Sequence, residues 1–214
     1  MWKFQDLHNE FSAPAHIHRL PKKDIKHVNT IDAELMITNN GTLNVDVYGI
    51  DSECVLKTLN IQGREMNCSV VAGDRVLIGT RDRRVFVFTK HNLEMAACIE
   101  VPEEVHCMCL LSEGSRVAVG MTDGHLWLID VAQPAEWNRI LMNEQFRETG
   151  NMYSICGINN DTELAVGTAS GVHIIQIDAF SMKKIDAHKF DNKTVWNICE
   201  YDENKIAVSC WEDH

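Results

Sequence analysis

The chain lacks the features of a membrane-spanning, secreted or nucleic-acid-binding protein. No stretch approaches the ~18 apolar residues of a membrane span, and the first residues, interrupted by Lys3, Asp6 and Glu10, lack the apolar centre of a signal peptide. Positive charge is scarce as well, because 31 acidic residues against 20 basic ones give a net charge of −11. A phosphate-binding surface needs the opposite sign. We expect a cytoplasmic protein, with the nucleus as the alternative, that binds neither membrane nor nucleic acid.

Catalytic motifs are also missing. The sequence contains no G-x-x-x-x-G-K-[ST], no G-x-G-x-x-G after a strand, no H-E-x-x-H, no G-x-S-x-G and no EF-hand loop. Two close pairs, Cys107 with Cys109 and His16 with His18, supply only two metal ligands each, and zinc sites need more. The sequence predicts a protein that is not an enzyme and holds no cofactor and no metal.

What is present is a repeat of about forty-odd residues. Its best copies are 75–88, 116–129 and 163–176, aligned on the glycine that ends each first apolar run. The anchors are Gly79, Gly120 and Gly167, with weaker partners at Thr38 and Ser209. Each copy is a short apolar run, a turn and an alternating apolar run, which predicts two strands joined by a hairpin. The predicted turns are Asn40-Gly41, Asp123-Gly124 and Ser170-Gly171.

Two further strands fit between successive copies. Inner strands are predicted to start near residues 25, 66, 105, 152 and 195, and fourth strands at 54–61, 94–101, 135–141 and 182–189. Four short strands in a unit of this period predict an all-β propeller built from four-stranded antiparallel blades. Five cysteines share the inner-strand positions, and we expect them to be reduced and shielded core residues: Cys68, Cys107, Cys109, Cys156 and Cys199.

These units resemble the WD-repeat family. The resemblance lies in the inner strands, the glycine at the end of the second strand, the Asp123-Gly124 turn, and the run Leu126–Asp130, where a blade's Trp-Asp pair would stand. No blade carries a Gly-His pair before its inner strand. The resemblance implies a propeller over residues ~25 to 214 that binds proteins or peptides.

The positions of the repeats divide the chain into an N-terminal arm, 1–24, and a partial propeller, 25–214, with four full blades and the first two strands of a fifth. A ring of about seven blades would need roughly 290 residues. The remaining blades would then belong to a longer chain. The alternative is a four-bladed ring that leaves the last half-unit out.

A propeller brings equivalent residues of successive blades to one rim. The second residue of each inner strand is expected there, namely Asn67, His106, Tyr153 and Trp196, with Lys26 in the first blade. The turns between second and third strands add Arg81, Arg83 and Asp123. In the family that this sequence resembles, these places commonly contact partners, and aromatic side chains are enriched in binding centres.

Other interpretations of these residues stay open. In one alternative, Tyr153 and Trp196 are core residues that pack between blades. In another, His106 is a structural residue held by hydrogen bonds. The Arg81–Arg84 turn is either a solvated hairpin tip or a contact for an acidic or phosphorylated peptide.

We therefore predict a non-catalytic protein-interaction scaffold that binds a protein or peptide at the rim. A first alternative is a regulatory propeller belonging to a larger catalytic protein such as a kinase. A second is an enzyme with its active site at the mouth of the channel, which a cluster of titratable groups would favour.

Overall fold

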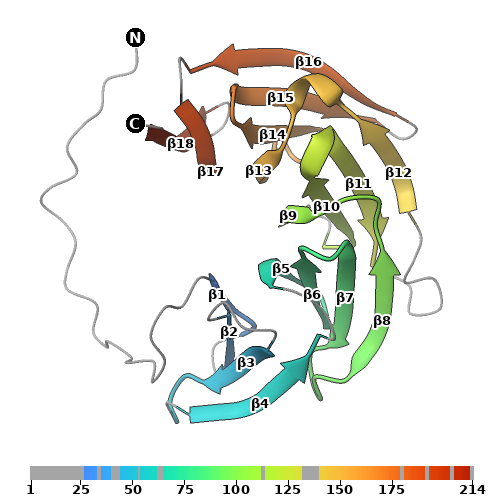
Figure 1. Cartoon of the computed structure of the whole chain (residues 1–214), viewed down its shortest axis with the longest axis vertical. Coiled ribbons are helices and arrows are strands. Elements are labelled where there is room, and N and C mark those ends of the chain that lie inside the picture. Colours follow the sequence, from blue (N-terminus) through green and yellow to red (C-terminus); the bar gives the residue numbers. More distant parts are fainter. Residues whose placement is uncertain are drawn as a thin grey trace, which may run out of the picture.

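The protein is described from a computed structural model (Figure 1). The described residues are 27–32, 35–39, 44–52, 54–61, 65–111, 114–131, 140–178, 181–190, 193–202 and 205–212. Within these ranges the chain forms β-strands and two single-turn 3-10 segments, Thr122–Gly124 and Arg147–Thr149, and no α-helix. No helix there is long and apolar enough to cross a membrane. The predicted arm, the Asn40-Gly41 turn and Lys26 lie outside the described residues.

Four antiparallel sheets of four strands follow one another along the chain. The first holds β1 (His27–Thr30), β2 (Leu35–Asn39), β3 (Asn44–Gly49) and β4 (Cys54–Asn60). The second holds β5 (Met66–Ala72), β6 (Arg75–Thr80), β7 (Arg84–Thr89) and β8 (Met95–Glu100). The third holds β9 (Val105–Leu110), β10 (Arg116–Met121), β11 (His125–Asp130) and β12 (Ile140–Gln145). The fourth holds β13 (Met152–Ile158), β14 (Glu163–Thr168), β15 (Gly171–Ile177) and β16 (Met182–Lys189).

A two-stranded hairpin of β17 (Lys193–Asp202) and β18 (Lys205–Glu212) follows the fourth sheet; we call it the C-terminal hairpin. Figure 1 shows the sheets in a curved row, with β4, β8, β12 and β16 along its outside. The inner strands β1, β5, β9, β13 and β17 contact one another in succession. The prediction of four blade-like antiparallel sheets and a further half-unit is confirmed. The described strands form a curved row, and no closed ring is seen among them.

The hydrophobic core lies between neighbouring sheets. Val45 and Val47 of β3 share a buried cluster with Phe86 and Phe88 of β7, and the same stacking recurs between β7 and β11 and between β11 and β15. The second and third strands are therefore covered on both faces. This explains why their sequences are almost continuously apolar, as in Val76–Ile78, rather than strictly alternating.

The recurring glycines mark the places where neighbouring sheets approach most closely. A Cβ atom on Gly79 would lie 2.5 Å from Cγ1 of Val105, and one on Gly167 would lie 2.6 Å from Cγ1 of Val195. Gly120 lies in the same way against Met152. We call four buried residues near the start of the inner strands the seam residues; they are Met66, Val105, Met152 and Val195, all at most 2% exposed. The glycines of the repeat thus make room for Val105, Met152 and Val195.

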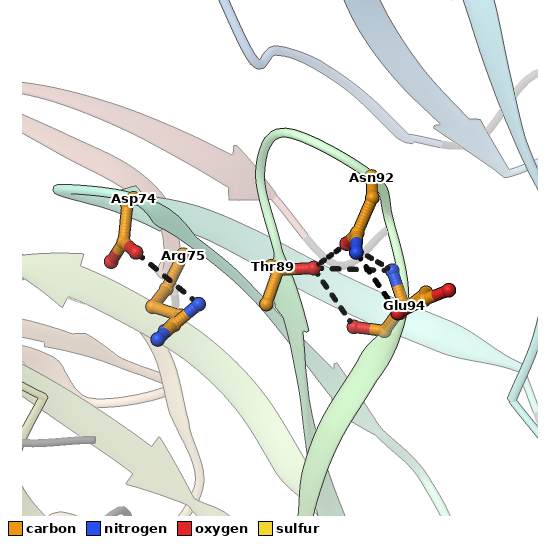
Figure 2. Close-up of polar contacts among 5 residues, drawn as sticks. All are labelled: Asp74, Arg75, Thr89, Asn92 and Glu94. Atoms are coloured by element: carbon orange, nitrogen blue, oxygen red, sulfur yellow. Dashed lines mark hydrogen bonds and ion pairs between the residues drawn. The ribbon is translucent and has the colours of Figure 1, made fainter.

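At the ends of the sheets opposite the seam residues, neighbouring strands are joined by tight turns. Figure 2 shows one of them, where Thr89, Asn92 and Glu94 hold the turn between β7 and β8. The Asn92 amide nitrogen donates to the Glu94 carboxylate at 2.9 Å, and Thr89 donates to Asn92. Beside this turn, Arg75 pairs with Asp74 at 3.3 Å. These contacts lie within the second sheet and stabilise its own turns.

Two predictions need correction. The strand predicted at 135–141 is found at Ile140–Gln145, because the chain reaches β12 only after a longer connection from β11 than the corresponding connections in the other units. Cys199 is exposed rather than shielded, and among the described residues no further sheet follows the C-terminal hairpin along the chain. Cys68 and Cys107 are buried as predicted, whereas Cys109 and Cys156 are half-buried.

Candidate functional site

Each of the last four inner strands carries a β-bulge at the same place. In β5 the ladder pairs Met66 with Thr80 and Cys68 with Gly79, so that Asn67 between them has no partner on β6. The ladders of β9, β13 and β17 skip one residue in the same way. We call the four bulged residues the rim row: Asn67, His106, Tyr153 and Trp196. A bulge re-aims a side chain and is frequent beside functional sites.

The rim row is continuous from the second sheet to the C-terminal hairpin. The Asn67 amide nitrogen donates to the backbone oxygen of Val105 at 2.8 Å, next to His106. The rings of His106 and Tyr153 meet edge to face, with centroids 5.5 Å apart. The rings of Tyr153 and Trp196 lie 5.0 Å apart and tilted by 45°. Residues far apart in the sequence are thus brought side by side, one each from the second, third and fourth sheets and one from the C-terminal hairpin.

Exposure separates the rim row from the seam. Trp196 is 52% exposed, whereas Val195, the residue before it, is fully buried. Tyr153 is half-buried and lies between Trp196 and His106. An interpretation of Trp196 as core packing between blades does not agree with this exposure. The row therefore offers an open aromatic surface at its Trp196 end.

His106 is held as a neutral ring near neutral pH. Partial burial lowers its pKa below the ordinary value of 6.5, while Glu104 opposes this shift and Arg81 adds to it. A neutral imidazole stacks against Tyr153 without the cost of burying a charge. His106 thus serves as an aromatic member of the row.

The second-to-third-strand turn of the second sheet reaches the same end. Arg81 bonds Glu65 at 3.2 Å and Glu104 at 3.0 Å, which links the second sheet to the third. Arg83 pairs with Glu103 at 3.5 Å. The two guanidinium groups proposed for an acidic peptide are therefore already engaged by carboxylates of the chain, although both side chains are at least half exposed.

Asp123 lies at the matching turn of the third sheet. Its backbone has a positive φ of 54°, and Gly124 follows at 71°, as a tight hairpin turn requires. The Asp123 amide donates to the side chain of Asn151 at 3.3 Å, and its carbonyl accepts from Gln145 at 3.3 Å. The exposed residue is thus fixed beside the start of β13.

Sequence reasoning missed one aromatic residue at this end. Trp211 on β18 is 62% exposed and pairs with Thr194, next to the seam residue Val195. It stands two residues after Ser209, where Arg81 stands after Gly79. Applying the repeat alignment to the last half-unit would have found it. The bulges have no such signal, because they depend on how two strands pair.

The side chains at the rim row and its neighbouring turns are mainly aromatic rings and carboxylates. Among the described residues, no group of three or more His, Cys, Asp or Glu side chains is placed to hold a metal ion. Burial raises the pKa of Cys68 to about 12, so this thiol stays protonated. The rim row offers ring faces and edges, and the neighbouring turns offer carboxylates.

No model of a known protein family matches the chain, and no curated protein matches it either.

Proposed function

We propose that this protein is part of a β-propeller of the WD-repeat type and acts as a non-catalytic scaffold that binds a protein or peptide through the rim row. The observation that supports the proposal best is the row itself. Four bulged residues from four successive units lie in contact, and the row ends in the half-exposed Trp196. Bulges that serve packing alone would not leave a tryptophan in water.

The surroundings of the row favour a partner with apolar and basic side chains. Glu65, Glu103 and Glu104 lie beside its first half, and they already neutralise Arg81 and Arg83. An acidic peptide would have to displace these carboxylates. A basic side chain can pair with them, and an arginine can also stack on the open face of Trp196. Binding of such a partner should weaken as salt is raised.

Affinity capture from cell extract with three matched proteins tests the proposal. The wild type and Tyr201→Ala should retain the same partners, because Tyr201 is an even more exposed aromatic residue at the other end of β17. Trp196→Ala should lose those partners, as truncation of a central aromatic residue at an interface costs about 2 kcal/mol or more. Equal recovery of every partner by Trp196→Ala and the wild type would contradict the proposal.

A further inference from the structure

Arg83 has a backbone conformation that an arginine rarely adopts. It is the last of the three residues between β6 and β7, and its φ is 65°. A turn of this length places its last residue in the left-handed region, where glycine is usual and most other side chains are strained. The third sheet has Gly124 at the matching position, with a φ of 71°. The second sheet therefore keeps a strain that a glycine would remove.

The other residues that share this conformation have a local explanation. In the described part of the chain, six residues other than glycine have a positive φ. Four are Asn or Asp, whose short polar side chains tolerate this region: Asp123, Asn159, Asn160 and Asp161. Leu93 is only 8% exposed and belongs to the core cluster between the first and second sheets, so packing offsets its strain. Arg83 is 61% exposed, so neither explanation applies to it.

The contacts of Arg83 within the chain do not offset the strain either. Its guanidinium has one ion pair, to Glu103 at 3.5 Å, and an exposed pair of this kind adds little stability. Its backbone oxygen accepts from the N–H of Val101 at 3.0 Å, a bond that any residue at this position would make. The guanidinium therefore keeps N–H donors open to water. Strained backbone of this kind clusters at functional sites.

Arg83 lies beside the rim row. Its partner Glu103 directly precedes Glu104, and His106 follows two residues after Glu104. Around this turn four carboxylates face three guanidinium groups, namely Glu65, Asp82, Glu103 and Glu104 against Arg81, Arg83 and Arg84. The local charge is therefore negative, which disfavours an anion as the group that Arg83 binds. A neutral main-chain carbonyl oxygen can accept from the guanidinium without displacing any of these carboxylates.

We propose that Arg83 is a binding residue of the rim and donates hydrogen bonds to main-chain carbonyl oxygens of the bound peptide segment. This inference rests on the proposed function, because the rim row provides the surface along which that segment lies. The rings of the row contact side chains of the partner, whereas Arg83 holds its backbone. The strained conformation thus serves binding and not stability.

The probe is a peptide selected on the wild type from a phage-displayed library of random sequences and then synthesised with a fluorescent label. Fluorescence anisotropy gives its Kd, and urea unfolding gives the stability of the same proteins. Arg83→Gly removes the side chain and relieves the strain in one change. Asn160→Gly is the matched control, because Asn160 is exposed, has a φ of 53° and lies at the other end of β13 from Tyr153.

We expect Arg83→Gly to weaken binding of the probe about tenfold, as the loss of a hydrogen bond from a charged donor does. Its midpoint of urea unfolding should equal or exceed that of the wild type, because the strain is gone. Asn160→Gly should leave the Kd unchanged. The ratio between Arg83→Gly and the wild type should persist at ~1 M salt, since a bond to a neutral carbonyl is screened less than an ion pair.

Trp196→Ala separates failure of this inference from failure of the proposed function. If no selected peptide depends on Trp196, the proposed function is contradicted and this inference falls with it. If Trp196→Ala weakens the probe but Arg83→Gly binds it as tightly as the wild type, this inference alone is wrong. A clearly lower urea midpoint of Arg83→Gly would show that the arginine serves the fold. A tenfold ratio that disappears at high salt would show that Arg83 binds a charged group, against the proposal.

Discussion

The seam and the rim row are made of consecutive residues that have opposite environments. Val105, Met152 and Val195 are fully buried against the preceding sheet, whereas the residues that follow them lie in bulges and contact one another along the rim. A single extra residue per strand thus separates a buried packing position from a position on the rim row. The ladder resumes its ordinary pairing after each bulge, so the rim residues can vary without disturbing the core.

Thiol reactivity should show the largest contrast between covered and open faces. Cys68 and Cys107 lie buried beside the seam, and Cys199 is exposed on the hairpin. Because the pKa of Cys68 is raised to about 12, its thiolate is scarce, and access also requires opening of the sheet. Cys199 should react about a thousandfold faster or more at pH 8. Labelling with a small alkylating reagent followed by peptide mapping measures both rates, and comparable rates would contradict the packing described.

Removal of a seam residue should have the largest effect on stability. Met152→Ala deletes a fully buried side chain that lies against Gly120. We expect a loss of about 2–5 kcal/mol in the free energy of unfolding, measured with urea. Trp196→Ala is the comparison, and it should change the free energy of unfolding by less than ~1 kcal/mol because half of that ring is already in water. Equal losses would mean that the rim row is part of the core.

Enlarging the side chain at an anchor position should lower the free energy of unfolding by a smaller amount, and only where a neighbouring sheet covers that position. Gly167→Val would place new atoms where Val195 already lies, so we expect a loss of about 1–3 kcal/mol. Ser209→Val introduces the same side chain at the matching exposed position of the hairpin, and it should stay within ~0.5 kcal/mol of the wild type. A large loss with Ser209→Val would show that its face is covered.

Loss of the ion pairs at the rim should have the smallest effect. Arg81→Ala removes the contacts to Glu65 and Glu104, but these side chains are partly exposed. We expect a loss of at most ~1 kcal/mol at low salt, which should vanish near 1 M salt because of screening. Urea unfolding at the two salt concentrations measures it. A loss that is insensitive to salt would assign Arg81 a packing role instead.

Much of the fold could be predicted because each strand has a local pattern of apolar residues bounded by turn residues. β16 has the predicted bounds, Met182–Lys189, and the hairpins at Asp123 and Gly171 have the turn residues that such turns require. β12 was placed too early, because the prediction began the strand at Ala135 and the connection from β11 extends to Ile140. Local sequence also could not identify Cys199 as exposed, since that depends on whether another sheet covers β17.

The residues of the candidate site could be selected from the sequence, but the β-bulges that place their side chains could not. Equivalence of the repeats selected Asn67, His106, Tyr153 and Trp196, and the structure brings them into one row. The bulges that turn these side chains out of the ladder arise from the pairing of two strands, so a single strand does not encode them. The engagement of Arg81 by two carboxylates likewise depends on residues from two different sheets.

The most direct test of the account is a pair of measurements on Trp196→Ala. One is the affinity for a partner captured by the wild type, and the other is the free energy of unfolding in urea. The account predicts a loss of binding of about 2 kcal/mol or more, roughly 30-fold in Kd, with stability changed by less than ~1 kcal/mol. If binding is lost only in proportion to unfolding, with a stability loss of ~3–5 kcal/mol typical of a core aromatic residue, the rim row is not the binding site.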